Sequence, residues 1–214
     1  MANLCSSDIY FYAEEDKRNQ LLDFYNKVKS WFSPQKNPKR PGMVVNDKNL
    51  YGLSRALILS GCYQTDEKGE ITNPSCPYHR GTVETISEIE KNMFSISTET
   101  DWTPAVKMWQ EIIVFLGYDI YIRYVAEESG NEVFLTNIKD YVGYYRVDWS
   151  SGFNSDIEGP LPEEDTKILL QKILKTKENN MDNLKEMAEN FSDSGIDDHF
   201  IILNNYSYCA IEDC

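Results

Sequence analysis

The region 94–124 constrains the fold of this chain most strongly, because a strand, a helix and a second strand follow one another there. Apolar and polar residues alternate over 94–99, which is typical of a strand. Thr103 and Pro104 are a favoured cap and first-turn residue for a helix, and Gly117 is typical of a helix end. The helix has one apolar face, made of Val106, Trp109, Ile112, Ile113 and Leu116. Because such a face must pack on a sheet, the region predicts a βαβ unit.

Similar patterns precede this unit and give the order of the whole core. Residues 7–13 alternate as a strand, and residues 16–32 have helical spacing with acidic residues early and lysines late, as the helix dipole favours. Residues 82–89 and 93–98 predict a hairpin. The resulting order of strand, helix, strand, strand, helix, strand is that of a ferredoxin-like α+β sandwich. Right-handed crossovers would place both helices on the same face of the sheet.

We expect two regions in the chain. Residues 1–150 are predicted to form the ferredoxin-like core, with an insertion at about 33–80 that begins with three prolines in ten residues, a composition that excludes helix and inner strand. Strands near 133–135 and 141–149 are predicted to extend the antiparallel sheet. Residues 151–214 are predicted to form an acidic helical extension that packs on the core and covers part of the open side of its sheet.

The extension has local patterns of its own. Residues 150–162 contain glycine, proline and acidic residues and predict a loop. Apolar residues at helical spacing predict helices around 168–174 and 184–191, with a break near 179–180. Two short apolar runs within 199–211 predict a final hairpin.

The composition fits a cytoplasmic protein without covalent cross-links. With 214 residues, 41% of them hydrophobic, the chain can bury a core without disulfides. Its 5 cysteines are odd in number and irregularly spaced, and no apolar signal sequence follows a basic start, so we expect a reducing compartment. No apolar run is long enough to span a membrane.

The net charge of −14 excludes broad nucleic-acid binding from the expected functions. Proteins that hold phosphate backbones along a wide surface use Lys and Arg to displace counterions. Most of the acidity lies after residue 55, where twenty-nine Asp and Glu outnumber twelve Lys and Arg. This charge favours a partner with a basic surface.

Three short segments resemble motifs of a known family. NLCSS at residues 3–7 resembles the Asn-Trp-Cys-Ser-Asn opening of the YubB-type ferredoxin-like family. RGTVE at 80–84 stands where that family has Trp-Gly-Thr-Lys-Trp, without its two tryptophans. FSIST at 94–98, with DWTP at 101–104, resembles its Phe-x-Thr-x-Trp-x-Pro-Pro segment. The resemblance covers about residues 1–150 and implies a ferredoxin-like fold in a protein of phages, plasmids or related mobile elements; the family has no agreed catalytic residues to carry over.

The common catalytic motifs are missing from the sequence. His79 and His199 are the only histidines, and the chain has no nucleophile elbow, zinc-protease motif, phosphate-binding loop or dinucleotide-binding glycine pattern. Glu127 and Glu128 are adjacent in a predicted hairpin turn, where acids are usually solvated, whereas an acid–base pair needs two different environments. We therefore predict a non-enzymatic protein without a cofactor, in which Glu128 lies at the surface.

Cys62, Cys76 and His79 are the one grouping that resembles a metal site. The Cys-x-x-His spacing is half of a zinc knuckle. The residues that follow Cys62 offer no second ligand, however, and a closed structural zinc site needs four ligands. We expect these residues to bind no metal.

Aromatic residues are concentrated in the predicted strands and helices, at Tyr141, Tyr144, Tyr145 and Trp149 and at Trp102 and Trp109. Ferredoxin-like sheets that bind RNA use exposed aromatic side chains. The charge around these residues is negative, and strands are rich in tyrosine and tryptophan for packing alone. We therefore favour packing within the fold over a base-stacking role.

The acidic residues of the C-terminal half support the first functional hypothesis, in which carboxylates present negative charge to a basic groove. We predict a non-enzymatic inhibitor or accessory protein of a mobile element, such as an anti-defence or anti-CRISPR protein, that binds a host nucleic-acid-binding protein. The alternative interpretation is a solvated surface that only keeps the protein soluble. The residues predicted to bind the partner are Glu127, Glu128, Glu132, Asp156, Glu158, Glu163, Glu164 and Asp165.

A second hypothesis is the binding or sequestration of a small anion or nucleotide. Lys36, Lys39 and Arg40 form the only basic cluster of the sequence, within the proline-rich run. In this hypothesis the cluster and the open face of the sheet hold the ligand, whereas the alternative is a solvated loop.

Overall fold

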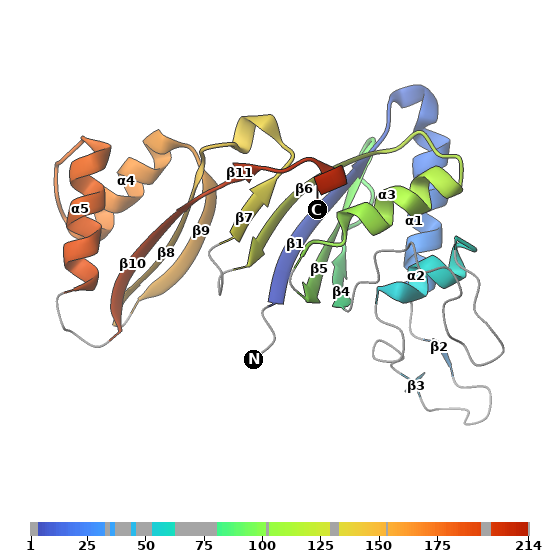
Figure 1. Ribbon diagram of the computed structural model, residues 1–214, viewed down its shortest axis with the longest axis horizontal. Coiled ribbons are helices and arrows are strands. Elements are labelled where there is room, and N and C mark those ends of the chain that lie inside the picture. Colours follow the sequence, from blue (N-terminus) through green and yellow to red (C-terminus); the bar gives the residue numbers. More distant parts are fainter. Residues whose placement is uncertain are drawn as a thin grey trace. The chain divides into compact units, whose positions relative to one another are not determined.

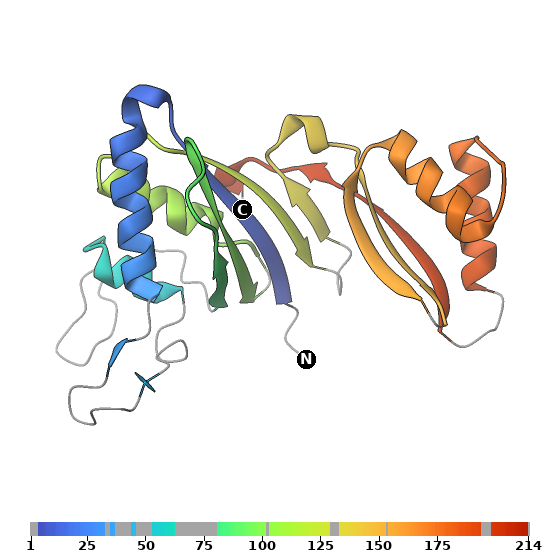
Figure 2. The same ribbon diagram turned by 180° about the vertical axis from the view of Figure 1, so that it is seen from behind.

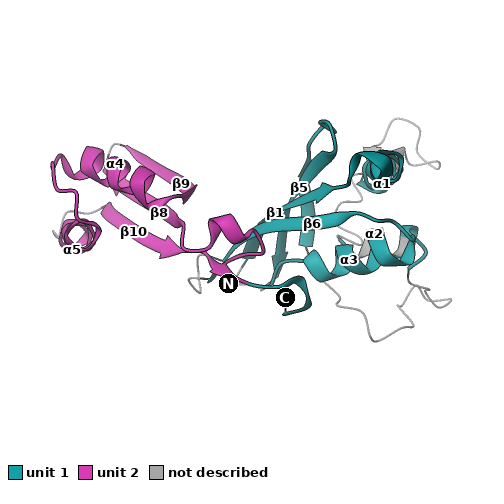
Figure 3. Ribbon diagram, turned by 90° about the horizontal axis from the view of Figure 1, so that it is seen from above, with its two compact units in different colours: residues 1–133, 209–214 teal, residues 134–208 magenta. Residues whose placement is uncertain are grey.

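The computed structural model describes residues 4–32, 35–36, 44–45, 53–62, 81–101, 103–128, 133–152, 154–193 and 198–213 (Figure 1). These residues form a mixed α+β fold, as predicted, with a six-stranded sheet, a three-stranded sheet and a two-stranded ladder. The chain divides into two compact units (Figure 3): unit 1 comprises residues 1–133 and 209–214, and unit 2 comprises residues 134–208. No helix of the described residues is long and apolar enough to cross a membrane.

The elements of unit 1 follow the predicted order of strand, helix, strand, strand, helix, strand, with a short helix inserted after the first one. They are β1 (Leu4–Tyr12), α1 (Arg18–Phe32), α2 (Ser54–Leu59), β4 (Gly81–Ile86), β5 (Met93–Asp101), α3 (Val106–Phe115) and β6 (Tyr121–Glu128). The short strands β2 (Gln35–Lys36) and β3 (Val44–Val45) pair with each other. Most of the insertion predicted at 33–80 lies outside the described residues.

β1 is an inner strand of the larger sheet, whose order is β11-β7-β6-β1-β5-β4. It pairs antiparallel with both β5 and β6, so that Ile9 lies between Ile96 and Tyr124. β5 and β6 are therefore parallel to each other, and α3 connects them by crossing over β1. The predicted hairpin of β4 and β5 is confirmed. The βαβ unit predicted at 94–124 is confirmed too, in the split form in which another strand lies between its two strands.

The core of unit 1 lies between this sheet and its helices. Phe11 of β1 contacts Trp109 of α3 with ring centroids 5.6 Å apart, and Phe24 of α1 contacts the same indole at 6.3 Å. All three side chains are fully buried. Helices α1 and α3 therefore pack on the same face of the sheet, as predicted, and both ribbon views show them on one side (Figure 1 and Figure 2).

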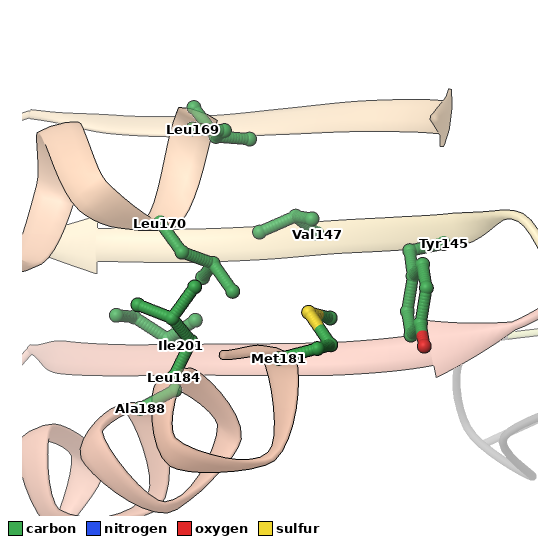
Figure 4. Packing of buried hydrophobic residues seen from close by; sticks show 8 residues of the cluster. All are labelled: Tyr145, Val147, Leu169, Leu170, Met181, Leu184, Ala188 and Ile201. Atoms are coloured by element: carbon green, nitrogen blue, oxygen red, sulfur yellow. The ribbon is translucent and has the colours of Figure 1, made fainter. Parts of the chain in front are cut away.

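Unit 2 is built mainly of a three-stranded antiparallel sheet, in the order β10-β8-β9, with two helices. Its elements are β7 (Val133–Thr136), a 3-10 helix (Lys139–Tyr141), β8 (Tyr145–Ser151), β9 (Ser155–Leu161), α4 (Glu163–Leu174), α5 (Met181–Ser192), β10 (His199–Asn205) and β11 (Ser207–Tyr208). The two helices and the break between them are where the sequence predicted them. The core that joins them to β8 and β10 consists of Tyr145, Val147, Leu169, Leu170, Met181, Leu184, Ala188 and Ile201 (Figure 4).

Several predictions for the C-terminal half differ from the structure. The strand predicted at 141–149 is β8, but it pairs with β9 and β10 instead of extending the larger sheet. The region 150–162, which was predicted to be a loop, contains β9. Gly159 and Pro160 are typical of loops, so the sequence pattern did not indicate this strand. The predicted final hairpin is wrong, because β10 pairs with β8 while β11 pairs with β7 in parallel. Helices α4 and α5 pack on the sheet of their own unit, and the predicted boundary near residue 150 falls within β8.

Candidate functional site

The acidic residues predicted to bind a partner belong to different units. Glu127 and Glu128 end β6 in unit 1, and Glu132 lies outside the described residues. The others lie in unit 2, on β9 and in the first turn of α4: Asp156, Glu158, Glu163, Glu164 and Asp165. The structure therefore gives no support for a single surface made of all eight.

Glu128 is not a surface residue, contrary to the prediction. β6 continues to residue 128, and strand alternation turns Glu128 to the same side as Ile122 and Tyr124, where it is only 3% exposed. The Glu128 carboxylate is close enough to influence Cys5, because it contributes to the raised pKa of that thiol, of which burial is the main cause. A thiol with a raised pKa stays protonated at neutral pH, so Cys5 is not an activated nucleophile.

The acids at the start of α4 are exposed but partly neutralised. Lys167 lies 2.6 Å from Glu163 and 3.1 Å from Glu164, measured from Nζ to carboxylate oxygen. Hydrogen bonds to Glu163 and then Glu164 raise the pKa of Lys167. Carboxylates at a helix N-terminus also interact favourably with the helix dipole. These residues therefore have a local structural role in α4.

A more continuous acidic surface lies on α5, and the sequence prediction did not identify it. Four acidic residues recur there at steps of four, three and four, which places them on one side of the helix. Each of them is exposed, whereas the opposite side of α5 carries Leu184 and Ala188 into the core. The spacing alone could have revealed this acidic stripe, which consists of Asp182, Glu186, Glu189 and Asp193.

A groove of about 570 Å³ runs between this stripe and strand β10. Glu189 and Asp193 of the stripe line it, together with Lys185, whose ammonium group lies 5.3 Å from the centre of the Tyr145 ring. The remaining lining residues are uncharged, and they are Ala188, Ser192, Ile201, Ile202, Leu203 and Asn205. We call this site the acidic groove.

One side of the acidic groove is the edge of a sheet. β10 pairs with β8 on one side only in the three-stranded sheet. The Oγ of Ser192 accepts a hydrogen bond from the backbone N–H of Ile201 at 2.9 Å, so the backbone groups of Ile201 point away from β8. Because backbone direction alternates along a strand, the N–H and C=O of Leu203 point to the same outer side. The edge of β10 is thus closed at Ile201 and offers backbone groups at Leu203.

A second cavity in unit 2, of about 490 Å³, has the opposite electrostatic character. Lys172, Lys175 and His199 line it, and none of its described lining residues is Asp or Glu. Lys175 ends α4 in the left-handed conformation, with φ of 53°, where glycine is usual. The other lining residues are Trp149, Ser151, Asn154, Leu169, Ile173, Leu174 and Phe191. We call this site the cationic cavity.

The predicted aromatic cluster does not form a stacking platform. Trp109 and Tyr145 are buried, Trp149 lines the cationic cavity, and Trp102 lies outside the described residues. Tyr141 and Tyr144 contact each other, with ring centroids 5.4 Å apart.

An aromatic pair that was not predicted lies on the side of the larger sheet opposite α1 and α3. Tyr12 and Tyr121 stack there at 5.1 Å, and the guanidinium of Arg123 lies 4.8 Å from the Tyr12 ring.

The residues of the other predicted sites are only partly described. Cys62 is half-buried, and burial raises the pKa of its thiol. Cys76 and His79 lie outside the described residues, and the residues that are described contain no group of three metal-ligating side chains. Of the basic cluster, Lys36 lies in β2, while Lys39 and Arg40 also lie outside the described part of the chain.

Comparison with known proteins adds no assignment to this geometry. No protein-family model, curated protein or solved structure matches the chain.

Proposed function

We propose that the protein is a non-enzymatic accessory protein of a phage, plasmid or related mobile element that binds a basic surface of a host protein. The observation that carries the proposal is the acidic groove, which Glu189 and Asp193 line together with residues of β10, at the edge of the sheet. A partner that normally binds nucleic acid has the complementary charge. Occupying its basic surface would inhibit it, which is the role expected of an anti-defence protein.

The backbone at Leu203 suggests how such a partner would bind. An extended segment can add to an exposed sheet edge, where main-chain hydrogen bonds contribute affinity and side-chain contacts contribute specificity. Lys or Arg side chains of that segment would face Glu189 and Asp193. Attraction between opposite charges would speed association and make it sensitive to salt.

The assignment to a mobile element is part of the same proposal. It rests on the resemblance of residues 1–150 to the YubB-type family. The strand order β6-β1-β5-β4, with antiparallel neighbours, supports a ferredoxin-like assignment of unit 1.

Charge reversal tests whether the acidic groove binds the partner. Tagged wild-type protein would be used at low salt to capture proteins from a bacterial lysate, and captured proteins would be identified by mass spectrometry. We expect a basic nucleic-acid-binding protein to be retained, released by added salt, and lost with Glu189→Lys/Asp193→Lys. Capture of no such protein at low salt would contradict the proposal.

The acids named from the sequence provide a matched control. Asp156→Lys/Asp165→Lys reverses two exposed charges, on β9 and α4, outside the lining of the acidic groove. We expect this variant to retain the partner nearly as well as the wild type. Equal loss in both double variants would show that net charge, and not the acidic groove, determines binding.

A further inference from the structure

The cationic cavity is unusual in a protein with a net charge of −14. Unit 2 contains fourteen Asp and Glu against seven Lys and Arg, yet the cavity is lined by two lysines and no described carboxylate. Lys167, one turn earlier in α4, has two acidic partners. Lys172 and Lys175 form no ion pair with the residues that the structure describes. Two lysines therefore line this cavity, and no described acidic residue lines it or forms an ion pair with them.

The rest of the cavity lining is mainly apolar. Leu169, Ile173 and Leu174 of α4 contribute aliphatic side chains. The ring of Phe191 and the imidazole of His199 lie nearly parallel, at an interplanar angle of 10° and a centroid distance of 5.3 Å. Trp149 adds a further aromatic side chain from β8. Flat rings pack well against such surfaces, because aromatic pairs favour offset stacking or edge contacts.

Three residues with hydrogen-bonding side chains also line the cavity, each at or next to the end of a strand. Ser151 ends β8, Asn154 precedes β9, and His199 begins β10. Small-molecule sites are typically concave, mostly apolar, and supplied with a few polar groups that orient the ligand. The volume of about 490 Å³ lies within the usual range of roughly 300–1,000 Å³ for such sites.

We propose that the cationic cavity binds a small organic anion with a flat, aromatic or otherwise apolar body. Its carboxylate, sulfonate or phosphate group lies next to Lys172 and Lys175, and its body packs among Ile173, Phe191 and Trp149. This site is separate from the acidic groove, because the two share no lining residue. It is also separate from the proline-rich basic loop of the sequence-based hypothesis.

Two probes of the same shape test the role of charge. 1-Naphthoate carries an anionic group, and 1-naphthamide has the same ring system without the charge. Binding of each to the full chain would be measured by isothermal titration calorimetry and by the shift in melting temperature. We expect naphthoate to bind at least about tenfold more tightly than naphthamide. Equal binding of the two, or no binding of naphthoate, would overturn the proposal.

Substitutions locate the binding site. Lys172→Gln/Lys175→Gln should weaken naphthoate binding by about tenfold or more. Lys177→Gln is the matched control, because Lys177 is exposed and close in sequence but does not line the cavity. Both lysines of the double variant are exposed, so we expect it to keep the wild-type circular dichroism spectrum. Unchanged binding in the double variant, or equal weakening by Lys177→Gln, would overturn the assignment.

Discussion

The hydroxyl of Ser192 in α5 accepts a hydrogen bond from the backbone N–H of Ile201 in β10, at 2.9 Å. The same hydroxyl lies 3.2 Å from the carbonyl oxygen of Ile201 and 3.1 Å from that of Ala188. A single side chain thus holds the helix end against the strand and occupies backbone groups at the edge of the sheet. Exposed sheet edges promote association between chains, and proteins commonly block them.

Ser192→Ala should therefore lower stability and open the edge of β10. We expect a loss of about 1 kcal/mol in the free energy of unfolding, as for one intramolecular hydrogen bond, measured by urea denaturation. Sedimentation velocity should show more self-association than in the wild type. Ser155→Ala, an exposed position on β9, serves as the control and should change neither property. A variant as stable and as monodisperse as the wild type would contradict this role of Ser192.

Trp109→Ala should be strongly destabilising, because the indole is fully buried between α1, α3 and β1. The expected loss is about 3–5 kcal/mol, which is typical of emptying a large aromatic site. Trp109→Phe should lower the free energy of unfolding clearly less, because the indole N–H of Trp109 has no hydrogen-bond partner among the described residues. Chemical denaturation of both variants measures the difference. Similar losses for alanine and phenylalanine would contradict this account.

Glu128 is buried, although the sequence predicted a surface position, where Glu128→Ala would change stability by no more than about half a kcal/mol. At 3% exposure, truncation should instead cost about 1–3 kcal/mol, because it leaves a void at a buried position. Glu99→Ala on the exposed side of β5 is the comparison and should stay within about half a kcal/mol. Equal effects of the two substitutions in urea denaturation would show that Glu128 contributes no more than a surface acid.

Glu178 makes stability depend on pH at the start of α5. The backbone N–H of Asn180, the side chain of Asn183 and the backbone N–H of Asn179 donate to its carboxylate and lower its pKa below the usual value of 4.5. A lowered pKa in the folded state gives stability that is fully present above this value and is lost as pH falls through the folded-state pKa. Glu178→Gln should therefore flatten the fall of the melting temperature below about pH 4.5. Parallel curves for variant and wild type would contradict the prediction.

Local sequence signals predicted unit 1 well because each of its elements has a clear pattern. The alternation over 94–98 and the apolar face around Trp109 agree with the structure. The predicted cap at Thr103 is wrong, because α3 begins at Val106 and its N-cap is Ala105, which has no capping side chain. The right-handedness of crossover connections then correctly predicted that both helices lie on one side of the sheet. These rules depend on residues that are close in sequence. They were sufficient in unit 1, where elements that follow one another in the chain also pack together.

The same rules were insufficient for unit 2. β8 pairs with β10, and Tyr145 lies opposite Asn205 in that pair, far away in sequence. Alternation identifies a strand but not its partner. Both sites depend on such contacts, since the acidic groove forms where α5 meets β10 and the cationic cavity where α4 meets the ends of β8 and β10. Only the stripe that includes Glu189 and Asp193 could have been found from its spacing.

The position of β1 between β5 and β6 has a consequence for biosynthesis. Leu4 pairs with Asp101 and Ser6 pairs with Glu127, so β1 leaves the ribosome well before the residues of its two neighbouring strands are made. The Tyr124 hydroxyl donates to the carbonyl of Cys209 at 2.8 Å, a bond that forms only after all of unit 2 has been translated. Both hydrogen-bonding edges of β1 therefore stay unpaired on the nascent chain until β5 and β6 are made, and unpaired strand edges are prone to aggregation during synthesis.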